Sequence, residues 1–286
     1  VVEYKIGYPV KENVVATVYG NGDLEFSGSG NTMNFANGDT PWANEDYTYV
    51  IFKDEITPTN IDYWFTGNSN LTGCDTLPKS IESARGAFKD CASLIKTPSY
   101  FQCSALKIIT ECFSGCVNLE SSDPLPVNVM EADYAFQNCE KMSNAPDMTK
   151  TNALSSINGI LKGCTSLVEA PVIPDSVLDM TEAFAGDSNI YTASVFPENV
   201  ENISSAYLEC ISLEKAAAIP SSVLDCISCY EGCSNLYGEL AINTNTDKCD
   251  RLLYNAVSSG KILKLKGKSG RLFEIQQDSE SRYVTI

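Results

Sequence analysis

Apolar side chains recur along most of this chain at a nearly constant interval, and a three-residue pattern marks each recurrence. An aromatic residue or leucine is followed three positions later by cysteine, aspartate or asparagine, and six positions later by an aliphatic residue or methionine. The middle residue falls at positions 68, 91, 116, 139, 164, 187, 210 and 233, so the intervals are 23, 25, 23, 25, 23, 23 and 23 residues. The copies are Phe65-Asn68-Leu71, Phe88-Cys91-Leu94, Phe113-Cys116-Leu119, Phe136-Cys139-Met142, Leu161-Cys164-Leu167, Phe184-Asp187-Ile190, Tyr207-Cys210-Leu213 and Tyr230-Cys233-Leu236. A register kept over eight copies predicts a structural repeat.

Further columns keep the same register. An aliphatic residue stands seven positions before the aromatic position from Ile81 to Val223, and a small or apolar residue stands directly before it. A coil with inward side chains at fixed offsets buries them only against neighbouring coils, so the pattern predicts a solenoid. We call the third position of each copy, six after the aromatic residue, the Leu column. We expect a strand of about six residues that begins at this column. The expected fold is an α/β leucine-rich-repeat solenoid, with a parallel sheet on one face and short strands or helical turns on the other.

Two copies are 25 residues long and lack the proline that usually stands ten positions before the aromatic residue. We interpret them as two-residue insertions at a solvent-facing corner.

The segments that flank the repeats have the pattern of β-rich caps. Residues 14–28 predict a hairpin around a type I′ turn at Asn21-Gly22, a further strand is expected at residues 47–53, and Trp42 is expected to plug the entry to the core. Strands are also expected near residues 262–265, 272–275 and 283–286, where they would close the other end. The predicted division is an N-terminal β-rich cap over residues 1–55, a solenoid over 56–240 and a C-terminal cap over 241–286.

Eleven of the twelve cysteines fall in repeat columns, and only Cys103, in an inserted corner, has no core column. Buried cysteine behaves as a small apolar residue, and column neighbours about 4.8 Å apart are poorly placed for a disulfide. We therefore expect mostly free, buried thiols. The cluster Cys226-Cys229-Cys233 is explained by the same columns, and the chain has no histidine to complete a zinc site. No metal or cofactor is expected.

Charge restricts the classes of partner. The net charge is −17, and residues 1–250 hold 13 basic against 34 acidic residues. Such a body repels phosphate backbones, so nucleic-acid binding is not expected. No apolar stretch approaches the ~20 residues of a membrane span, so no membrane insertion is expected. Residues 251–286 hold 7 basic against 3 acidic residues, and we interpret Lys261, Lys264, Lys266, Lys268 and Arg271 mainly as the solvated side of a strand, with contact to an anionic surface as the alternative.

The repeat columns resemble the BspA-like leucine-rich repeats, the Treponema-type subclass with 23-residue repeats. The matching strings are AFKDCASL, CFSGCVNL, AFQNCEKM and YEGCSNL, with IPDSVLDMTEAF and IPSSVLDCISCY between copies. The segment from Ala16 to Trp42 is similar to the cap module that commonly precedes these repeats. This resemblance implies a right-handed solenoid in a bacterial surface or secreted protein that binds host proteins or other cells, and related modules occur in phage tail proteins.

The expected function is therefore recognition without catalysis, by a cell-surface or secreted module that binds a protein or a cell-surface glycan in adhesion. The alternative is a receptor-binding domain of a phage or bacteriocin tail fibre, and the oligomeric state stays open. No set of nucleophile, base and orienting residue is visible, and carboxylate pairs such as Glu198 and Glu201 are common in so acidic a chain. Outward positions of the expected strand are the candidate binding residues: Ile95, Lys96, Glu120, Ser143, Asn144, Glu169, Tyr191, Glu214, Lys215 and Tyr237.

Overall fold

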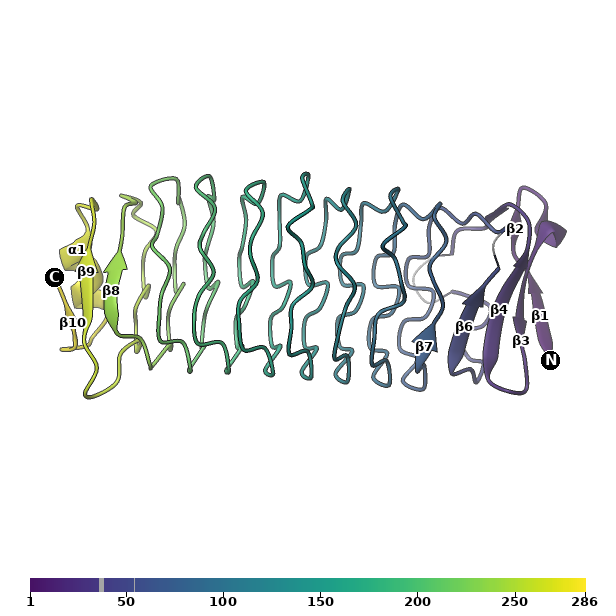
Figure 1. The fold of residues 1–286 in the computed structure, drawn as a ribbon, viewed down its shortest axis with the longest axis horizontal. Coiled ribbons are helices and arrows are strands. Elements are labelled where there is room, and N and C mark those ends of the chain that lie inside the picture. The colour runs from purple at the N-terminus through teal and green to yellow at the C-terminus, as the bar shows by residue number, and fades with distance from the viewer. Residues whose placement is uncertain (36–38, 54) are drawn as a thin grey trace.

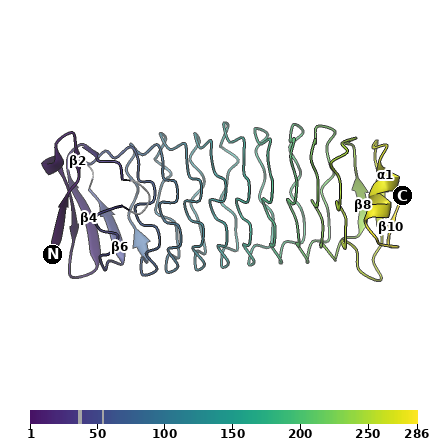
Figure 2. The same ribbon diagram turned by 180° about the vertical axis from the view of Figure 1, so that it is seen from behind.

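A computed structural model describes residues 1–35, 39–53 and 55–286, and it is an elongated solenoid of stacked coils (Figures 1 and 2). The coils are joined by parallel β-bridges in the column five positions before the aromatic residue. The bridged residues are Asn60, Ser83, Ile108, Glu131, Ser156, Asp179, Asn202 and Asp225, in chain order. Each bridge pairs residues 23 or 25 positions apart, so the register predicted from the sequence is confirmed.

One side of every coil is a tight, turn-rich segment around the aromatic residue. In the coil of Phe88, the N–H groups of Ala84, Gly86, Phe88 and Asp90 donate to carbonyls of the next coil at 2.7–2.9 Å, while those of Ala87 and Lys89 donate three residues back. Two columns of this segment have positive φ in each coil. They are Tyr63, Gly86, Glu111, Tyr134, Gly159, Glu182, Ser205, Ser228 and Arg251, and Gly67, Asp90, Gly115, Asn138, Gly163, Gly186, Glu209, Gly232 and Asn255. This left-handed backbone explains why the side forms turns and not strands.

The aromatic column forms the centre of the core. The rings of Phe88 and Phe113 stack at 5.5 Å between centroids, and those of Tyr207 and Tyr230 stack at 5.7 Å. Both tyrosines are fully buried, and the Tyr230 hydroxyl donates to the Ala217 carbonyl at 2.9 Å. Burying a hydroxyl costs little when it is hydrogen-bonded, so tyrosine replaces phenylalanine without an unpaired polar group.

The cysteine column adds a hydrogen bond between successive coils. Each of its six thiols donates to the carbonyl of the aromatic-column residue in the preceding coil. The donors are Cys91, Cys116, Cys139, Cys164, Cys210 and Cys233, and the sulfur–oxygen distances are 2.9–3.3 Å. All twelve cysteines are free in the structure, and eleven of them are buried.

The side that begins at the Leu column is less regular than the sequence predicts. Regular parallel strands occur there only near the two ends, in β7 (Gly73–Cys74) and β8 (Gly238–Ala241). Between them the coils are joined by single parallel bridges such as Lys96 with Ser121 and Thr192 with Lys215. In three of these coils a proline stands two positions after this bridged column, at Pro98, Pro146 and Pro171. Proline has no N–H to donate, which shortens the ladder there.

The N-terminal cap converts an antiparallel hairpin into the parallel stack. Its five-stranded sheet has the order β1 (Val2–Lys5), β3 (Val14–Val18), β4 (Asp23–Gly28), β6 (Tyr49–Phe52) and β7. The pairs β1–β3 and β3–β4 are antiparallel, whereas β4–β6 and β6–β7 are parallel. The 3-10 helix η1 (Lys11–Asn13) and the pair β2 (Gly7–Tyr8) and β5 (Asn31–Thr32) complete it. Trp42 is fully buried against Phe26, and its Nε1 donates to the Trp64 carbonyl at 2.9 Å.

The predicted hairpin is present, but its predicted type I′ turn is wrong. Gly22 has a φ of 91°, whereas neither Gly20 nor Asn21 has positive φ. A type I′ turn needs positive φ at both central residues. Instead, the Gly22 N–H donates to the Tyr19 carbonyl at 3.1 Å and the Tyr19 N–H donates to Asp23. The loop is therefore a three-residue loop that ends in a left-handed glycine, typical of a G1 bulge.

At the other end, β8 pairs in parallel with β9 (Leu263–Lys266), and β9 pairs with β10 (Val284–Thr285). The strand expected at residues 272–275 is wrong, because Leu272–Asp278 form helix α1. Leu272 packs against the core and Ile275 is buried within it, three positions apart on one helical face. A short apolar run does not by itself distinguish strand from helix. Within the described residues, no helix combines the length and the apolarity that a membrane crossing needs.

The expectation that Cys103 lies outside the core is also wrong. Cys103 is fully buried, and its thiol lies 3.4 Å from the Pro78 carbonyl oxygen. It stands ten positions before Phe113 and thus occupies the column of Pro78 and Pro126. The exposed residue of this inserted corner is Phe101, which is 70% exposed.

Candidate functional site

The predicted binding residues lie in two adjacent columns, seven and eight positions after the aromatic residue. Nine of the ten are exposed and Glu214 is half-buried. Neighbouring coils hold them in register, since the Glu214 N–H donates to the Tyr191 carbonyl at 2.9 Å and the Tyr237 N–H donates to the Glu214 carbonyl at 3.2 Å. These residues therefore stand on a backbone that is fixed from coil to coil.

Two tyrosine–glutamate pairs connect successive coils. The Tyr191 hydroxyl donates to Glu169 Oε1 at 2.7 Å, and the Tyr237 hydroxyl donates to Glu214 Oε2 at 3.1 Å. These hydrogen bonds to carboxylates raise the pKa of both phenols, so both stay neutral donors at physiological pH. The Lys261 ammonium lies 5.1 Å from the centroid of the Tyr237 ring. The pairs form a ladder of four side chains that present aromatic faces and carboxylates to solvent.

The remaining candidates divide between two places. Ile95, Lys96 and Glu120 lie on the N-terminal coils, where the Glu120 N–H donates to the Ile95 carbonyl at 2.9 Å and Lys96 Nζ lies 3.8 Å from Asp123. Ser143 and Asn144 instead line a hollow of about 620 Å³ together with Glu169. The structure thus brings part of the predicted set beside the tyrosine ladder and leaves three residues apart from it.

That hollow continues along the solenoid as a furrow. A second hollow of about 340 Å³ shares Pro171 and Val172 with it, and a third of about 580 Å³ shares Val195 and Phe196 with the second. Lys215 lines the third hollow, so the furrow extends from the coil of Phe136 to the C-terminal cap. We call this continuous depression the furrow.

The apolar residues of the furrow are not among the binding residues predicted from the sequence. Val168, Val172 and Val195 are exposed, although they are aliphatic. Val172 and Val195 stand 11 positions after the aromatic column of consecutive coils, at the last position of the expected six-residue strand. An aliphatic residue repeated in a column outside the core columns was the signal that could have identified them.

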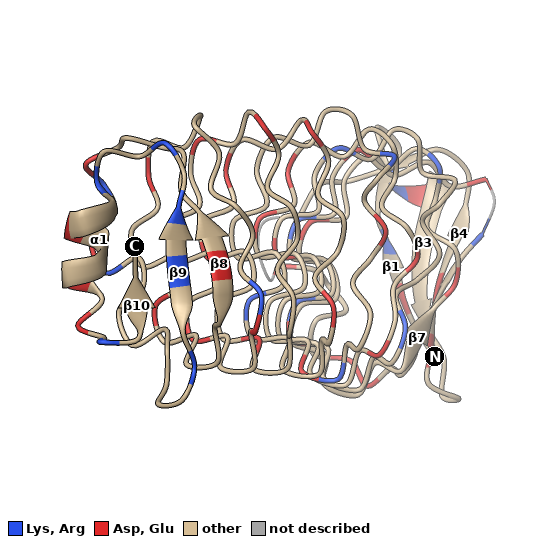
Figure 3. Cartoon of the chain, turned by 60° about the vertical axis from the view of Figure 1, so that its left-hand side comes forward, with Lys and Arg blue, Asp and Glu red and all other residues tan. Residues whose placement is uncertain are grey.

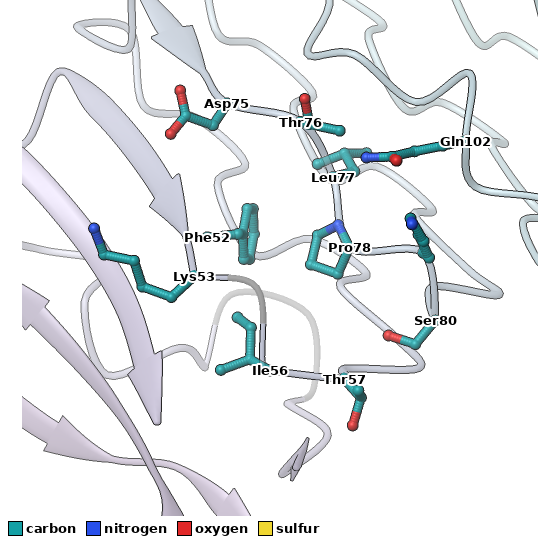
Figure 4. Close-up of a pocket in the computed structure, with 11 residues that line it drawn as sticks. Phe52, Lys53, Ile56, Thr57, Asp75, Thr76, Leu77, Pro78, Ser80 and Gln102 are labelled. Atoms are coloured by element: carbon teal, nitrogen blue, oxygen red, sulfur yellow. The ribbon is translucent and has the colours of Figure 1, made fainter. Parts of the chain in front are cut away.

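A larger hollow of about 850 Å³ lies between the N-terminal cap and the first coils, with Phe52 and Pro78 in its lining (Figure 4). Three charged residues line it, of which Lys53 and Asp75 have partners, whereas Lys79 forms no ion pair among the described residues. Lys53, which Figure 4 shows extending away from Pro78, lies 3.1 Å from Glu25, and Asp75 accepts a hydrogen bond from Tyr49 at 2.9 Å. Since two of its three charged lining residues already have partners, this hollow is a weaker candidate than the furrow.

The cysteine cluster near the C-terminus is part of the core. The thiols of Cys226 and Cys233 donate to different carbonyls, those of Lys248 at 3.4 Å and Tyr207 at 2.9 Å. Burial raises the pKa of Cys226 to about 12, which disfavours the reactive thiolate. Across the described parts of the chain, no three Cys, Asp or Glu side chains are grouped so that they could hold a metal ion.

The basic C-terminal segment follows the predicted alternation. Leu263 and Leu265 of β9 are buried, whereas Lys264 and Lys266 are exposed. Figure 3 shows basic positions on β9 next to an acidic position on β8. Lys266 pairs with Glu239 of β8 at 2.5 Å, so part of this charge is used between strands.

No protein-family model matches the chain, and no curated protein matches it. Among solved structures, it is similar to a leucine-rich-repeat protein of Eubacterium ventriosum, with 15% identity, a TM-score of 0.49 and coverage of 93% of this chain and 85% of the other. A leucine-rich-repeat protein of T. pallidum has 15% identity and a TM-score of 0.42, with coverage of 87% and 89%. A leucine-rich cell surface protein of Faecalibacterium prausnitzii has 15% identity and a TM-score of 0.28, with coverage of 91% and 94%. By the register of its own coils this chain is a solenoid of stacked 23- or 25-residue coils, and the solved structures to which it is similar are leucine-rich-repeat proteins.

Proposed function

We propose that this chain is a non-catalytic recognition module that binds a protein through the tyrosine ladder and the furrow beside it. The observation that carries the proposal is the pair of exposed hydrogen bonds from Tyr191 to Glu169 and from Tyr237 to Glu214. They hold two large amphipathic side chains in fixed positions on the solvent side of the coils. Tyrosine is enriched at protein interfaces because it offers a large contact area and a polar tip.

Preorganisation supports binding by this surface. Binding costs free energy for every side chain that must be immobilised, and the ladder tyrosines are already restrained by their glutamate partners. The backbone beneath them is held by hydrogen bonds between coils, as at the Tyr237 N–H and the Glu214 carbonyl. A partner that docks here therefore loses less free energy to ordering than it would on a mobile loop.

The resemblance to BspA-like repeats extends the proposal to the setting. We propose a cell-surface or secreted protein that acts in adhesion, with a host protein or another cell as its partner. The acidic body, at a net charge of −17, supports a partner other than nucleic acid.

The test compares two triple variants of the whole chain. One changes Tyr191, Glu214 and Tyr237 to serine, and the matched control changes Tyr8, Tyr19 and Glu140, which are exposed outside the ladder, to serine. Binding is measured by biolayer interferometry to immobilised extracellular-matrix proteins and by sedimentation with bacterial cells. We expect the ladder variant to bind at least about tenfold more weakly, and the control to bind as the wild type does.

The proposal is wrong if the wild-type chain binds none of these proteins or cells. It is equally wrong if the ladder variant, shown to be folded by circular dichroism, keeps wild-type affinity.

A further inference from the structure

The furrow is lined by apolar side chains that are exposed to solvent and do not belong to the core. Val172 is 70% exposed and Val195 is 84% exposed, and they occupy one column on consecutive coils. Both line the middle hollow together with Phe196, which is almost fully buried beneath them. Contiguous exposed apolar surface in a furrow with a polar rim is typical of an interaction site.

The charges of the furrow differ between its two ends. At the end toward the N-terminus Glu169 lines the hollow, and its carboxylate is bonded to Tyr191. At the other end Lys215 and the cap residue Lys268 line the same hollow of about 580 Å³. The acidic group Glu198 also lines this hollow, but it forms no ion pair among the described residues.

These two lysines share one hollow. Among the described residues, ten of the 20 lysine and arginine residues form ion pairs, although the chain has 37 acidic residues. Within the part of the chain that the structure describes, Lys215 and Lys268 have no such partner and face one hollow. Two ammonium groups without counter-ions, next to an apolar strip, are complementary to an apolar segment that carries a carboxylate.

We infer that the furrow binds an extended segment of the partner protein, with aliphatic side chains against Val172 and Val195 and a carboxylate between Lys215 and Lys268. This inference rests on the proposed recognition function and names the partner's chemistry. An acidic side chain and a chain-terminal carboxylate would satisfy the lysines equally well. An apolar strip alone would not select between acidic and basic segments, whereas the lysines would.

The experiment uses the full chain and an array of immobilised hexapeptides. Each peptide carries valine, isoleucine or leucine in its first four positions, and the sets end in two acidic residues, in two lysines, or in two serines. The acidic and lysine sets are amidated at the C-terminus, whereas the serine set keeps its free carboxylate. We expect the wild type to retain the acidic set at least about tenfold more strongly than the lysine set. The comparison with the free-carboxylate set shows which source of carboxylate the lysines take.

Charge reversal provides the decisive comparison. The double variant Lys215→Glu and Lys268→Glu should lose its preference for the acidic set, while Lys11→Glu and Lys141→Glu, which change two exposed lysines elsewhere, should keep it. Both variants change the net charge equally, so a general effect of charge would weaken binding in both. The variant Val172→Ser and Val195→Ser should weaken binding to all three sets.

Three outcomes would overturn the inference. One is equal retention of the acidic and lysine sets by the wild type, and another is equal loss of binding in both charge-reversal variants. The third is self-association in analytical ultracentrifugation that Val195→Asp abolishes, which would make a second copy of the chain the occupant. If the inference fails while the serine variant of the tyrosine ladder still loses partner binding, the proposed function stands without it.

Discussion

At the scale of single residues, two members of the column of hydrogen-bonding thiols are not cysteine. Asn68 still donates, from Nδ2 to the Tyr47 carbonyl at 3.0 Å, so within the described chain the exception without a donated hydrogen bond is Asp187. It is fully buried, and among the described residues neither of its carboxyl oxygens has a hydrogen-bond partner. A thiol at this position would donate to the Leu161 carbonyl, as Cys210 donates to the Phe184 carbonyl at 3.1 Å. An ionised carboxylate can only accept, so the site favours the protonated acid.

Burial raises the pKa of Asp187 well above 3.8, and the stability of the protein should therefore depend on pH. The unfolded carboxyl loses its proton near pH 3.8, whereas the folded one keeps it to higher pH. The stabilisation of the folded protein by the neutral carboxyl group is complete below the unfolded pKa and is lost as the pH rises toward the folded pKa. Over that range the free energy of unfolding falls by at most about 1.4 kcal/mol per pH unit. Urea denaturation of the wild type and Asp187→Asn from about pH 4.5 to about pH 7.5 measures this, because the amide does not ionise.

We expect the free energy of unfolding of the wild type to fall relative to Asp187→Asn as the pH rises. Asp187→Cys should remove the same pH dependence and stabilise the protein by about 1–3 kcal/mol at neutral pH, since it restores the donor to the carbonyl. A difference between wild type and Asp187→Asn that stays constant with pH would contradict the assignment of a buried, neutral carboxyl group.

At the scale of elements, the left-handed turn columns should be sensitive to side chains even where there is room for them. Gly186 has a φ of 79°, and a Cβ placed on it would meet only the Gly163 Cα at 4.0 Å. Gly186→Ala therefore tests backbone strain without a clash, and we expect a loss of about 1 kcal/mol in the free energy of unfolding. Gly20→Ala is the control, because nothing lies within 4 Å of its Cβ position and its φ is outside this region. Urea denaturation of both variants should show a lower midpoint for Gly186→Ala alone; equal midpoints would contradict the strain.

The sequence predicted those elements that depend on the repeat and missed those that depend on local backbone conformation. Columns such as Phe88 and Phe113 identified the core and the register, because each coil places the same offset in the same environment. The turn at Gly22 and helix α1 depend on φ angles and on the face of a short segment, which composition does not determine. The short strand ladder could have been predicted from prolines such as Pro171, which interrupt the expected strand and have no N–H to donate.

The candidate site was predicted in part for the same reason. The column positions of Tyr191 and Tyr237 made their exposure predictable, but their hydrogen bonds to the glutamates of adjacent coils required side-chain geometry. Lys268 reaches the furrow from the C-terminal cap, outside the repeat register, so no column pointed to it. Val195 was missed because only the two positions directly after the Leu column were taken as candidate binding positions, and Val195 lies five positions after Ile190 of that column.

At the scale of the whole molecule, the excess of acidic residues should make stability depend on ionic strength. Each of the ten ion pairs among the described residues has at least one side chain that is 32% or more exposed, and such pairs contribute about 0–1 kcal/mol each. Repulsion among the remaining carboxylates acts over the whole solenoid, whose net charge is −17, and salt screens it. We therefore expect the Tm at neutral pH to rise by about 2–4 °C when sodium chloride increases from about 20 mM to about 500 mM.

Near the pI of 4.3 the net charge is close to zero, so the same increase in salt should leave the Tm unchanged or lower it slightly through loss of the ion pairs. Differential scanning calorimetry at both pH values, with sodium chloride as the only variable, separates the two contributions. A fall in Tm with salt at neutral pH would contradict the expectation. It would mean that the pairs between coils, such as Lys162 with Glu182 at 2.8 Å, stabilise the solenoid by more than its net charge destabilises it.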